Sequence, residues 1–285
     1  MRKMPDAKII LFNAAAVLIT AGAVVGLLRS LVFTPTVSPC SERYTSSTVF
    51  ALQRGGVALT AADLQSSLSG NDAGVSDSLS IVKLRDAPSP LAMTVSLAKG
   101  STSPFASSAI KGGVSFPWRP RSVQGKSAAC LSYSVLLPAD FQFNRGGVLP
   151  GISGTEAGGS ASPEEFTARM VWREVGQGGA TLRITTSGGE TQFAAAERET
   201  YPFPRGRWVK LEQEVVLNTP RQSDGILRVW VDGKLAVERT DLIFRTRSGV
   251  AVAGVAADIF YGTAEGAGAA PADTKISLTP FDLRW

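Results

Sequence analysis

From about residue 81 to its end, the chain consists of short segments rich in β-branched and aromatic residues, separated by turn-forming clusters. Such segments are typical of β-strands, and the Gly, Pro, Asn and Asp clusters between them are typical of turns. No long stretch has the spacing of an amphipathic helix. The sequence therefore predicts an all-β fold, an antiparallel β-sandwich or jelly roll of the concanavalin-like kind. The segments expected to form strands are residues 80–84, 92–98, 112–118, 129–137, 166–174, 180–186, 207–217, 225–233, 234–242, 250–262 and 275–285.

Near the N-terminus, residues 9–28 form an uncharged run of 20 residues, about the length of a helix that crosses a hydrocarbon core. A short basic segment precedes it, and basic flanks favour the cytoplasmic side of a membrane. The pattern predicts a cytoplasmic flank at 1–8 and a single-pass anchor at 9–32 in a bacterial inner (plasma) membrane, with the C-terminal domain periplasmic or extracellular. The alternative is a cleaved signal peptide, because Ala21 and Ala23 have the spacing of a cleavage site inside the apolar run.

Residues 33–80 lie between this anchor and the strand-rich domain, which we place at 81–285. The first part of the segment has the composition of a juxtamembrane linker. Farther along, residues 60–68 have the pattern of a short helix with Thr60 as its N-cap. The segment is therefore expected to contain a linker and a little structure of its own.

Charge and histidine content exclude several functions. The formal net charge is +5, but residues 1–32 account for +3 of it, so the rest of the chain is nearly neutral and no nucleic-acid partner is expected. The chain contains no histidine, which excludes histidine-dependent triads, histidine metal sites and histidine general bases. We expect no cofactor and no metal.

The chain has two cysteines, Cys40 and Cys130, which are far apart and in no CxxC arrangement. In an oxidising compartment they would form one disulfide that ties the start of the domain to a core strand. Two separate thiols, with Cys130 buried, are the alternative.

Strand alternation divides the side chains of residues 166–174 between two faces. Thr167, Arg169 and Arg173 share one face, whereas the residues between them are apolar and typical of a core. The next strand places Arg183 in the same way. If the two strands are neighbours, three arginines line one surface suited to a carboxylated sugar chain, because guanidinium binds carboxylate bidentately. The alternative is a solvated face whose arginines are balanced by acidic neighbours.

Five stretches carry the pattern of one known family, in order. Residues 131–151 look like a strand followed by a Gly-Gly-Lys-Leu-Pro-Gly loop, and residues 166–174 look like a Ser-x-Arg strand followed by Met-Trp-Arg. Residues 205–245 match a long paired-strand region and are the most specific part. Residues 259–262 resemble a Phe-Phe-Gly-Gly strand end, and residues 271–285 match a closing strand. Together they resemble polysaccharide lyase family 14, the alginate and glucuronan lyase type. The resemblance covers roughly residues 90–285 and implies a jelly roll with a sugar-binding groove across one sheet.

The resemblance also implies a chemistry, β-elimination at a uronic acid. One group neutralises the carboxylate, a base removes the C5 proton and an acid protonates the leaving oxygen. It assigns Arg169 to the groove, places Thr167 where a serine is usual and makes Tyr261 the candidate base and acid. The sequence departs from the family at three places. The lysine of the loop is Val148, and residues 180–186, the strand that carries tyrosines in the family, contain none. The doubled glycine that follows the aromatic strand end in the family is Gly262-Thr263 here.

These inferences give a set of candidate site residues. The predicted catalytic residues are Tyr261 and Arg169. The predicted substrate-binding residues are Thr167, Arg173, Arg183, Gln213 and Arg145.

Two functions follow, and the sequence leaves both open. The expected partner is a polysaccharide, either acidic or a β-glucan. The first function is an anchored enzyme that trims an exported acidic polysaccharide by β-elimination. The second is a binding module that has lost its base and works beside a membrane polysaccharide synthase or exporter. A structural envelope protein without a glycan ligand is a weaker third possibility.

Overall fold

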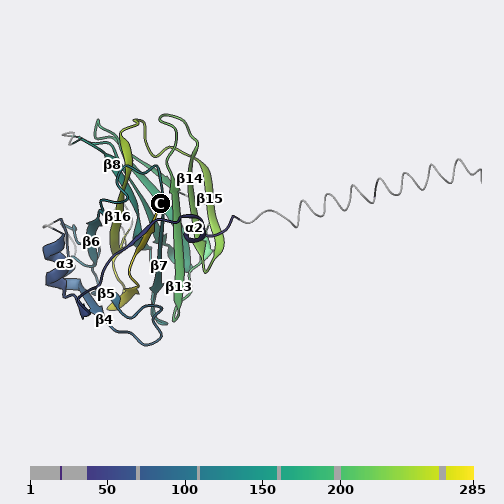
Figure 1. The fold of residues 1–285 in the computed structure, drawn as a ribbon. Coiled ribbons are helices and arrows are strands. Elements are labelled where there is room, and N and C mark those ends of the chain that lie inside the picture. The colour runs from purple at the N-terminus through teal and green to yellow at the C-terminus, as the bar shows by residue number, and fades with distance from the viewer. Residues whose placement is uncertain are drawn as a thin grey trace, which may run out of the picture. The chain divides into compact units, whose positions relative to one another are not determined.

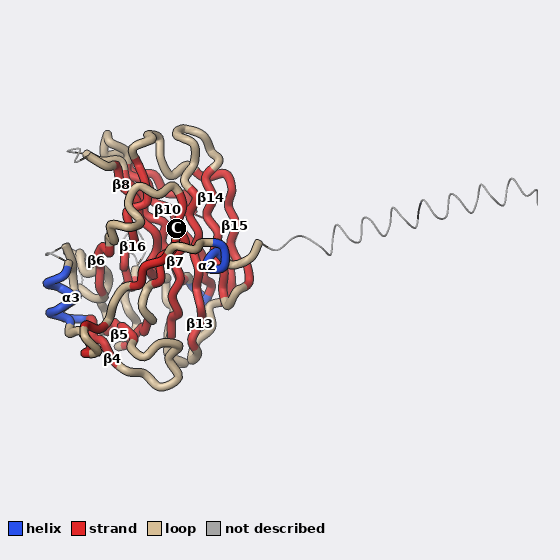
Figure 2. The backbone as a smooth tube through the Cα atoms, viewed as in Figure 1, coloured by secondary structure: helices blue, strands red, loops and turns tan. Residues whose placement is uncertain are grey.

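The computed structural model describes most of the chain from residue 37 onward (Figures 1 and 2). The described residues are 37–68, 71–107, 110–158, 162–195, 200–262 and 268–285, together with Thr20. The chain divides into two compact units, residues 1–37 and 38–285. None of the helices formed by the described residues is long and apolar enough to span a membrane. The predicted anchor at 9–32 lies outside the described residues, apart from Thr20.

The second unit contains two large antiparallel sheets. The nine-stranded sheet consists of β1 (Ser47–Val49), β4 (Leu79–Val82), β5 (Ala92–Leu97), β7 (Ala128–Leu136), β13 (Trp208–Val216), β14 (Gly225–Val231), β15 (Lys234–Leu242), β17 (Thr274–Leu278) and β18 (Asp282–Arg284). Its order is β15-β14-β13-β7-β17-β5-β4, and β18 pairs with both β7 and β1.

The seven-stranded sheet consists of β6 (Val114–Trp118), β8 (Gly147–Glu156), β9 (Glu165–Trp172), β10 (Gln177–Thr185), β11 (Thr191–Ala195), β12 (Tyr201–Pro202) and β16 (Val250–Tyr261). Its order is β11-β10-β9-β8-β16-β6, and β12 pairs with β10. The smaller elements are the hairpin β2 (Gln53–Arg54) and β3 (Val57–Ala58), the helices α2 (Cys40–Arg43), α3 (Ala61–Ser67) and α4 (Val75–Ser78), and the 3-10 turn η1 (Glu174–Gly176).

The two sheets pack face to face around one core, as Figure 1 shows for β7 and β13 beside β8 and β16. Alternate residues of each strand point inward, as in any half-buried sheet. On β9, for example, Ala168, Met170 and Trp172 are buried in this core. The predicted antiparallel sandwich or jelly roll is thereby confirmed for the described part of the chain.

Several strands were not predicted, namely β1, β2, β3, β8, β11 and β12, and β8 is the longest of them. Residues 147–151 were interpreted as part of a constrained loop, but they begin β8, a central strand of the seven-stranded sheet. Its sequence contains glycines and Pro150, which normally weaken a strand. The glycines are needed here because neighbouring atoms leave no room for side chains: a Cβ atom at Gly147 would collide with the Trp172 ring, and one at Gly154 with the Phe166 ring.

The segment before residue 81 is part of the folded unit. Strand β4 runs across the expected division at residue 81, and β1 pairs with β18. Helix α3 begins where predicted, with Thr60 and Asp63 forming a capping box. Residues 38–80 therefore belong to the same compact unit as the strands that follow.

Helix α2 is held on the nine-stranded sheet by a disulfide and by buried carboxylates. Cys40 and Cys130 form the disulfide, with a sequence separation of 90 and a Cα–Cα distance of 5.7 Å. Beside it, the Glu214 carboxylate accepts hydrogen bonds from Tyr44 and Arg228 and pairs with Arg43. Burial raises the pKa of Glu214, but these partners outweigh burial and hold the pKa below its ordinary value of 4.5.

The disulfide is expected to stabilise the fold, because it closes a long loop in the unfolded chain. Reduction should lower the free energy of unfolding by about 2–5 kcal/mol, measured by urea unfolding with and without a thiol reductant. The double variant Cys40→Ala, Cys130→Ala is the control and should be insensitive to reductant. An unfolding midpoint of the wild type that does not respond to reductant would contradict this role.

Candidate functional site

The outer face of the seven-stranded sheet collects the polar side chains of β9 and β10. The two strands are neighbours, so that Thr181 lies opposite Arg169 and Arg183 lies opposite Thr167. Residues opposite each other in an antiparallel pair share a face. Thr167, Arg169 and Arg183 therefore lie side by side on the outer face. This is the arrangement that the sequence pattern predicts if the two strands are neighbours.

These three residues line a hollow of about 200 Å³. The strands that form it are β6, β8, β9, β10 and β16. The residues that line the hollow are Ser115, Phe116, Pro117, Arg119, Ser153, Gly154, Thr155, Glu165, Phe166, Thr167, Arg169, Arg183, Ala253, Ala256 and Asp258. We call this surface the groove.

Arg169 is held in place by an acidic residue that was not predicted. Its Nε lies 2.6 Å from Oδ2 of Asp258 on β16, and the two side chains are 23% and 5% exposed. A carboxylate so deeply buried requires a partner, because an unpaired buried charge is costly. The ion pair uses Nε, and the two Nη atoms of Arg169 have no hydrogen-bond partner among the described residues.

The other two arginines of the groove, Arg119 and Arg183, pair with no carboxylate among the described residues. The acidic residues that line the groove are Asp258, which Arg169 already engages, and Glu165. The groove thus presents two guanidinium groups free to bind an anion. This argues against the alternative in which acidic neighbours simply balance the arginines.

Arg173 and Arg145 lie outside the groove. Arg173 follows β9, and its Nε is close to Gly179, where an added Cβ atom would lie 3.2 Å away. Its Nε and Nη2 are buried and have no hydrogen-bond partner among the described residues. Gly179 lies opposite Val171, on the same face of the sheet as Arg169. Arg173 therefore also lies against the outer face of the sheet, at a distance from the groove. Arg145 is exposed in the loop before β8.

Tyr261 lies in the core and not in the groove. The residue is 1% exposed, and its hydroxyl donates a hydrogen bond of 2.6 Å to the carbonyl oxygen of Gln142. The rings of Phe141 and Trp172 pack against it at centroid distances of 5.5 and 5.2 Å. Burial raises the pKa of Tyr261 further above its ordinary value of 10.0. The structure therefore does not bring this phenol to the arginines, nor does it favour the phenolate that a base requires.

Gln213 is also buried in the interior, but its side chain makes hydrogen bonds to β8 and β9, two of the strands that form the groove. It lies on β13 and is 0% exposed. Its Oε1 accepts a hydrogen bond of 2.8 Å from the Ile152 N–H, and its Nε2 donates one of 3.0 Å to the Ala168 carbonyl. Ile152 and Ala168 are register partners on β8 and β9. The amide of Gln213 therefore bridges these two strands from the opposite sheet.

The need for this bridge comes from a bulge at Pro150. The register between β8 and β9 shifts between Leu149 and Gly151, and Gly151 lies opposite Arg169. Pro150 has no N–H to offer the ladder, and its carbonyl accepts a hydrogen bond of 3.0 Å from the Tyr133 hydroxyl. Gln213 and Tyr133 thus satisfy backbone groups at the bulge. Gln213 positions the strand under Arg169 instead of contacting a ligand.

Replacing Gln213 by Leu keeps most of the volume but removes both hydrogen bonds. The buried Ile152 N–H and Ala168 carbonyl are then left unsatisfied, which should lower the free energy of unfolding by about 2–4 kcal/mol. Urea unfolding measures this loss.

The matched control is Gln53→Leu, at an exposed position of β2. Its effect should stay within about 0.5 kcal/mol. If Gln213→Leu were equally mild, the bridge would not be needed to hold the bulge.

Comparison with known proteins agrees with this architecture. Residues 86–281 match the family model of polysaccharide lyase 14. The chain belongs to the polysaccharide lyase 14 family. The resemblance inferred from the sequence is therefore confirmed, and a lyase-like, polysaccharide-handling jelly roll is established. No curated protein matches the sequence.

Solved alginate lyases share the fold. The marine PL-14 alginate lyase from Aplysia kurodai is 23% identical at a TM-score of 0.64, with 84% of this chain and 98% of that chain covered. Alginate lyase vAL-1 from Chlorella virus is 18% identical at a TM-score of 0.62, with 78% and 96% covered. The predicted membrane and synthase or exporter partners find no support in these comparisons.

Proposed function

We propose that this polysaccharide lyase 14 family protein binds a carboxylated polysaccharide along the groove. The observation that carries the proposal is the set of three arginines around one hollow, of which Arg119 and Arg183 have no carboxylate partner among the described residues. Guanidinium groups bind carboxylates with two parallel hydrogen bonds, which fits a chain of uronic acid residues. A neutral glucan would leave these charges unmatched.

Each part of the groove has a role in this binding. Arg169 is oriented by Asp258 and offers its remaining N–H groups to a carboxylate. Thr167 and Ser153 lie opposite each other on β9 and β8 and supply hydroxyl groups for the sugar hydroxyls. Arg183 lies across the strand from Thr167, so one sugar unit that contacts Thr167 can also reach a guanidinium.

The residues of the groove favour binding over elimination. Elimination needs a base for the C5 proton and an acid for the leaving oxygen. No lysine or tyrosine is among the described residues that line the groove, and the chain has no histidine. Burial raises the pKa of all four tyrosines, whereas a phenolate base needs a lowered pKa. Family membership is the observation that favours elimination as the second candidate function.

We further propose that the protein does this work outside the cytoplasm, held by a membrane anchor at 9–32. The uncharged run at 9–28 and its basic flank support the anchor. The Cys40–Cys130 disulfide supports an oxidising compartment. The polysaccharide would then be met as it leaves the cell.

The binding proposal is tested by Arg183→Ala. Losing one charge-assisted contact should weaken alginate binding by roughly tenfold or more, measured by titration calorimetry on the full-length protein. Because Arg183 has no partner among the described residues, the melting temperature should not change. The control Lys275→Ala removes the same charge from an exposed position of β17 in the other sheet and should bind like the wild type. Equal weakening by both variants would contradict a specific site.

Elimination is tested by incubating the protein with alginate, glucuronan and a neutral β-glucan while following the ultraviolet absorbance of the unsaturated product. Binding without product supports a binding protein, whereas product from a uronan that Arg169→Lys abolishes supports a lyase. Equal retention of the neutral glucan and the uronans would overturn recognition of the carboxylate.

A further inference from the structure

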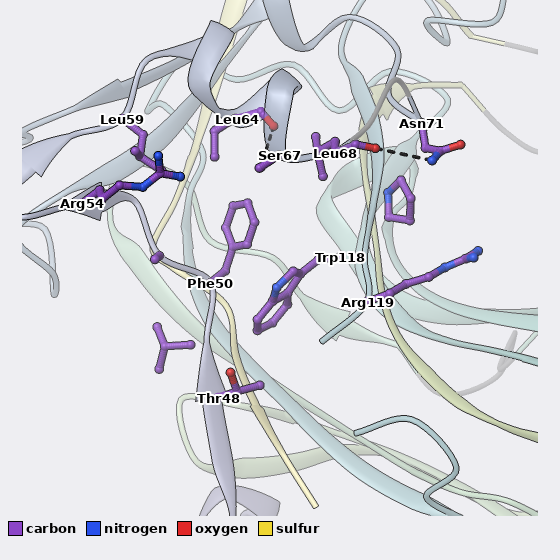
Figure 3. Close-up of a pocket in the computed structure, with 13 residues that line it drawn as sticks. Thr48, Phe50, Arg54, Leu59, Leu64, Ser67, Leu68, Asn71, Trp118 and Arg119 are labelled. Carbon is purple, nitrogen blue, oxygen red and sulfur yellow. Dashed lines mark hydrogen bonds between the residues drawn. The ribbon is translucent and has the colours of Figure 1, made fainter. Parts of the chain in front are cut away.

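A second cavity lies beside the groove, between the N-terminal part of the folded unit and the edge strand β6 (Figure 3). Its volume is about 580 Å³, larger than that of the groove. The residues that line it are Thr48, Val49, Phe50, Ala51, Arg54, Leu59, Leu64, Ser67, Leu68, Asn71, Pro117, Trp118 and Arg119. All but the last three precede the family match at 86–281, so the cavity is largely the product of a segment outside that match. We call it the edge pocket.

The edge pocket is fixed in place by backbone and aromatic contacts. Ala73 and Ser115 exchange two hydrogen bonds of 2.8 and 2.9 Å, which tie the N-terminal segment to β6. The Phe50 N–H donates to the Phe281 carbonyl at 2.9 Å, and the Phe50 ring packs against Trp118 at 5.4 Å. The walls are therefore preformed, which lowers the entropic cost of receiving a ligand.

The chemistry of the edge pocket matches an acidic sugar. Phe50 and the half-buried Trp118 form an aromatic pair at its centre, and Figure 3 shows Arg54 and Arg119 on either side of them. An indole ring offers an apolar face on which a pyranose can stack, with a polar N–H at its edge. The described lining residues include two arginines and no carboxylate. The charged residues of the lining are thus both positive, and an anionic occupant fits better than a neutral or purely apolar one. Asp63 of α3 lies outside the lining, but its pKa is lowered by hydrogen bonds from Thr60 and also by Arg54.

The edge pocket and the groove are neighbours. Pro117 and Arg119 line both of them. Ser115, whose backbone carries the tie to Ala73, also lines the groove. The two cavities therefore adjoin at the end of β6, where Arg119 borders both of them.

From these observations we propose that the edge pocket is a second sugar-binding site, which receives the continuation of the acidic polysaccharide as it passes from the groove over β6. Trp118 supplies the stacking surface, Arg54 binds a carboxylate inside the edge pocket, and Arg119 is shared by the two sites. This inference rests on the proposed binding of a uronan in the groove. It adds that the protein prefers long chains to short ones.

The test compares alginate trimers with alginate decamers by titration calorimetry on the full-length protein. The wild type should bind the decamer more tightly than the trimer. Arg54→Ala should weaken decamer binding by about tenfold and leave the affinity for the trimer unchanged. Arg54 is exposed, so the variant should fold normally. The control Arg85→Ala removes the same charge from an exposed residue that does not line the edge pocket, and it should keep the full gain.

Trp118→Ala should also abolish the gain, and its melting temperature must be recorded because Trp118 packs on Phe50 and Phe281. If this variant does not fold, Asn71→Ala, at an exposed position of the edge pocket, replaces it and should weaken decamer binding alone. A decamer that binds no more tightly than the trimer would overturn the edge pocket. So would an Arg54→Ala variant that weakens both ligands equally.

The two proposals fail in different ways. If Arg183→Ala does not change the affinity for the trimer, the proposed binding in the groove is contradicted, whatever the affinity for the decamer. If Arg183→Ala weakens trimer binding as expected but Arg54→Ala leaves decamer binding unchanged, only the proposal of the edge pocket is contradicted.

Discussion

The arginine face depends on one buried side chain in the opposite sheet. Gln213 stands between the Ile152 N–H and the Ala168 carbonyl, at the point where the bulge of β8 interrupts its ladder with β9. Buried backbone groups without partners are costly, so a bulge in a central strand requires a substitute partner. Arg169 follows Ala168 directly. The position of the arginine on the outer face is therefore set by a hydrogen bond made on the inner one.

The same stretch of β13 serves both sides of its sheet. Gln213 points inward to the bulge, whereas its neighbours Glu212 and Glu214 point outward to α2. Glu212 accepts a hydrogen bond of 3.0 Å from the Ser41 N–H beside the disulfide, and Glu214 binds Tyr44. Period-two alternation thus lets three consecutive residues connect the N-terminal segment, the nine-stranded sheet and the strand beneath the groove.

Much of this could be predicted from the sequence, and the failures have physical causes. Strands with regular alternation were found, but β8 was not, because its glycines and Pro150 are needed for close approach and for the bulge. Tyr261 was assigned to the site by the family resemblance, and neither Tyr261 nor Gln213 was assigned by the face of its strand. Alternation held the missing signal: Gln213 falls in phase with the buried Leu211.

The alternation of faces along β16 would also have placed Tyr261 and Asp258. Tyr261 is in phase with the buried Ile259, and Asp258 is out of phase with both. An acidic residue in an otherwise uncharged strand segment, on the face opposite the core, indicates a charge partner across the sheet. The pairing of Asp258 with Arg169 depends on which strands are neighbours, and the sequence alone did not settle the order β9-β8-β16.

The small net charge of the chain beyond residue 32 limits how the groove can work. Its long-range field is weak, and at physiological salt charges more than about 8 Å apart are largely screened. Attraction of a polyanion must therefore come from contacts made at short range by guanidinium groups such as Arg119 and Arg183. A single short hollow offers few such contacts. Because Arg119 also lines a second cavity, whose charged lining residues are both positive, a long uronan can add contacts on both sides of β6, and affinity then grows with chain length instead of with net charge.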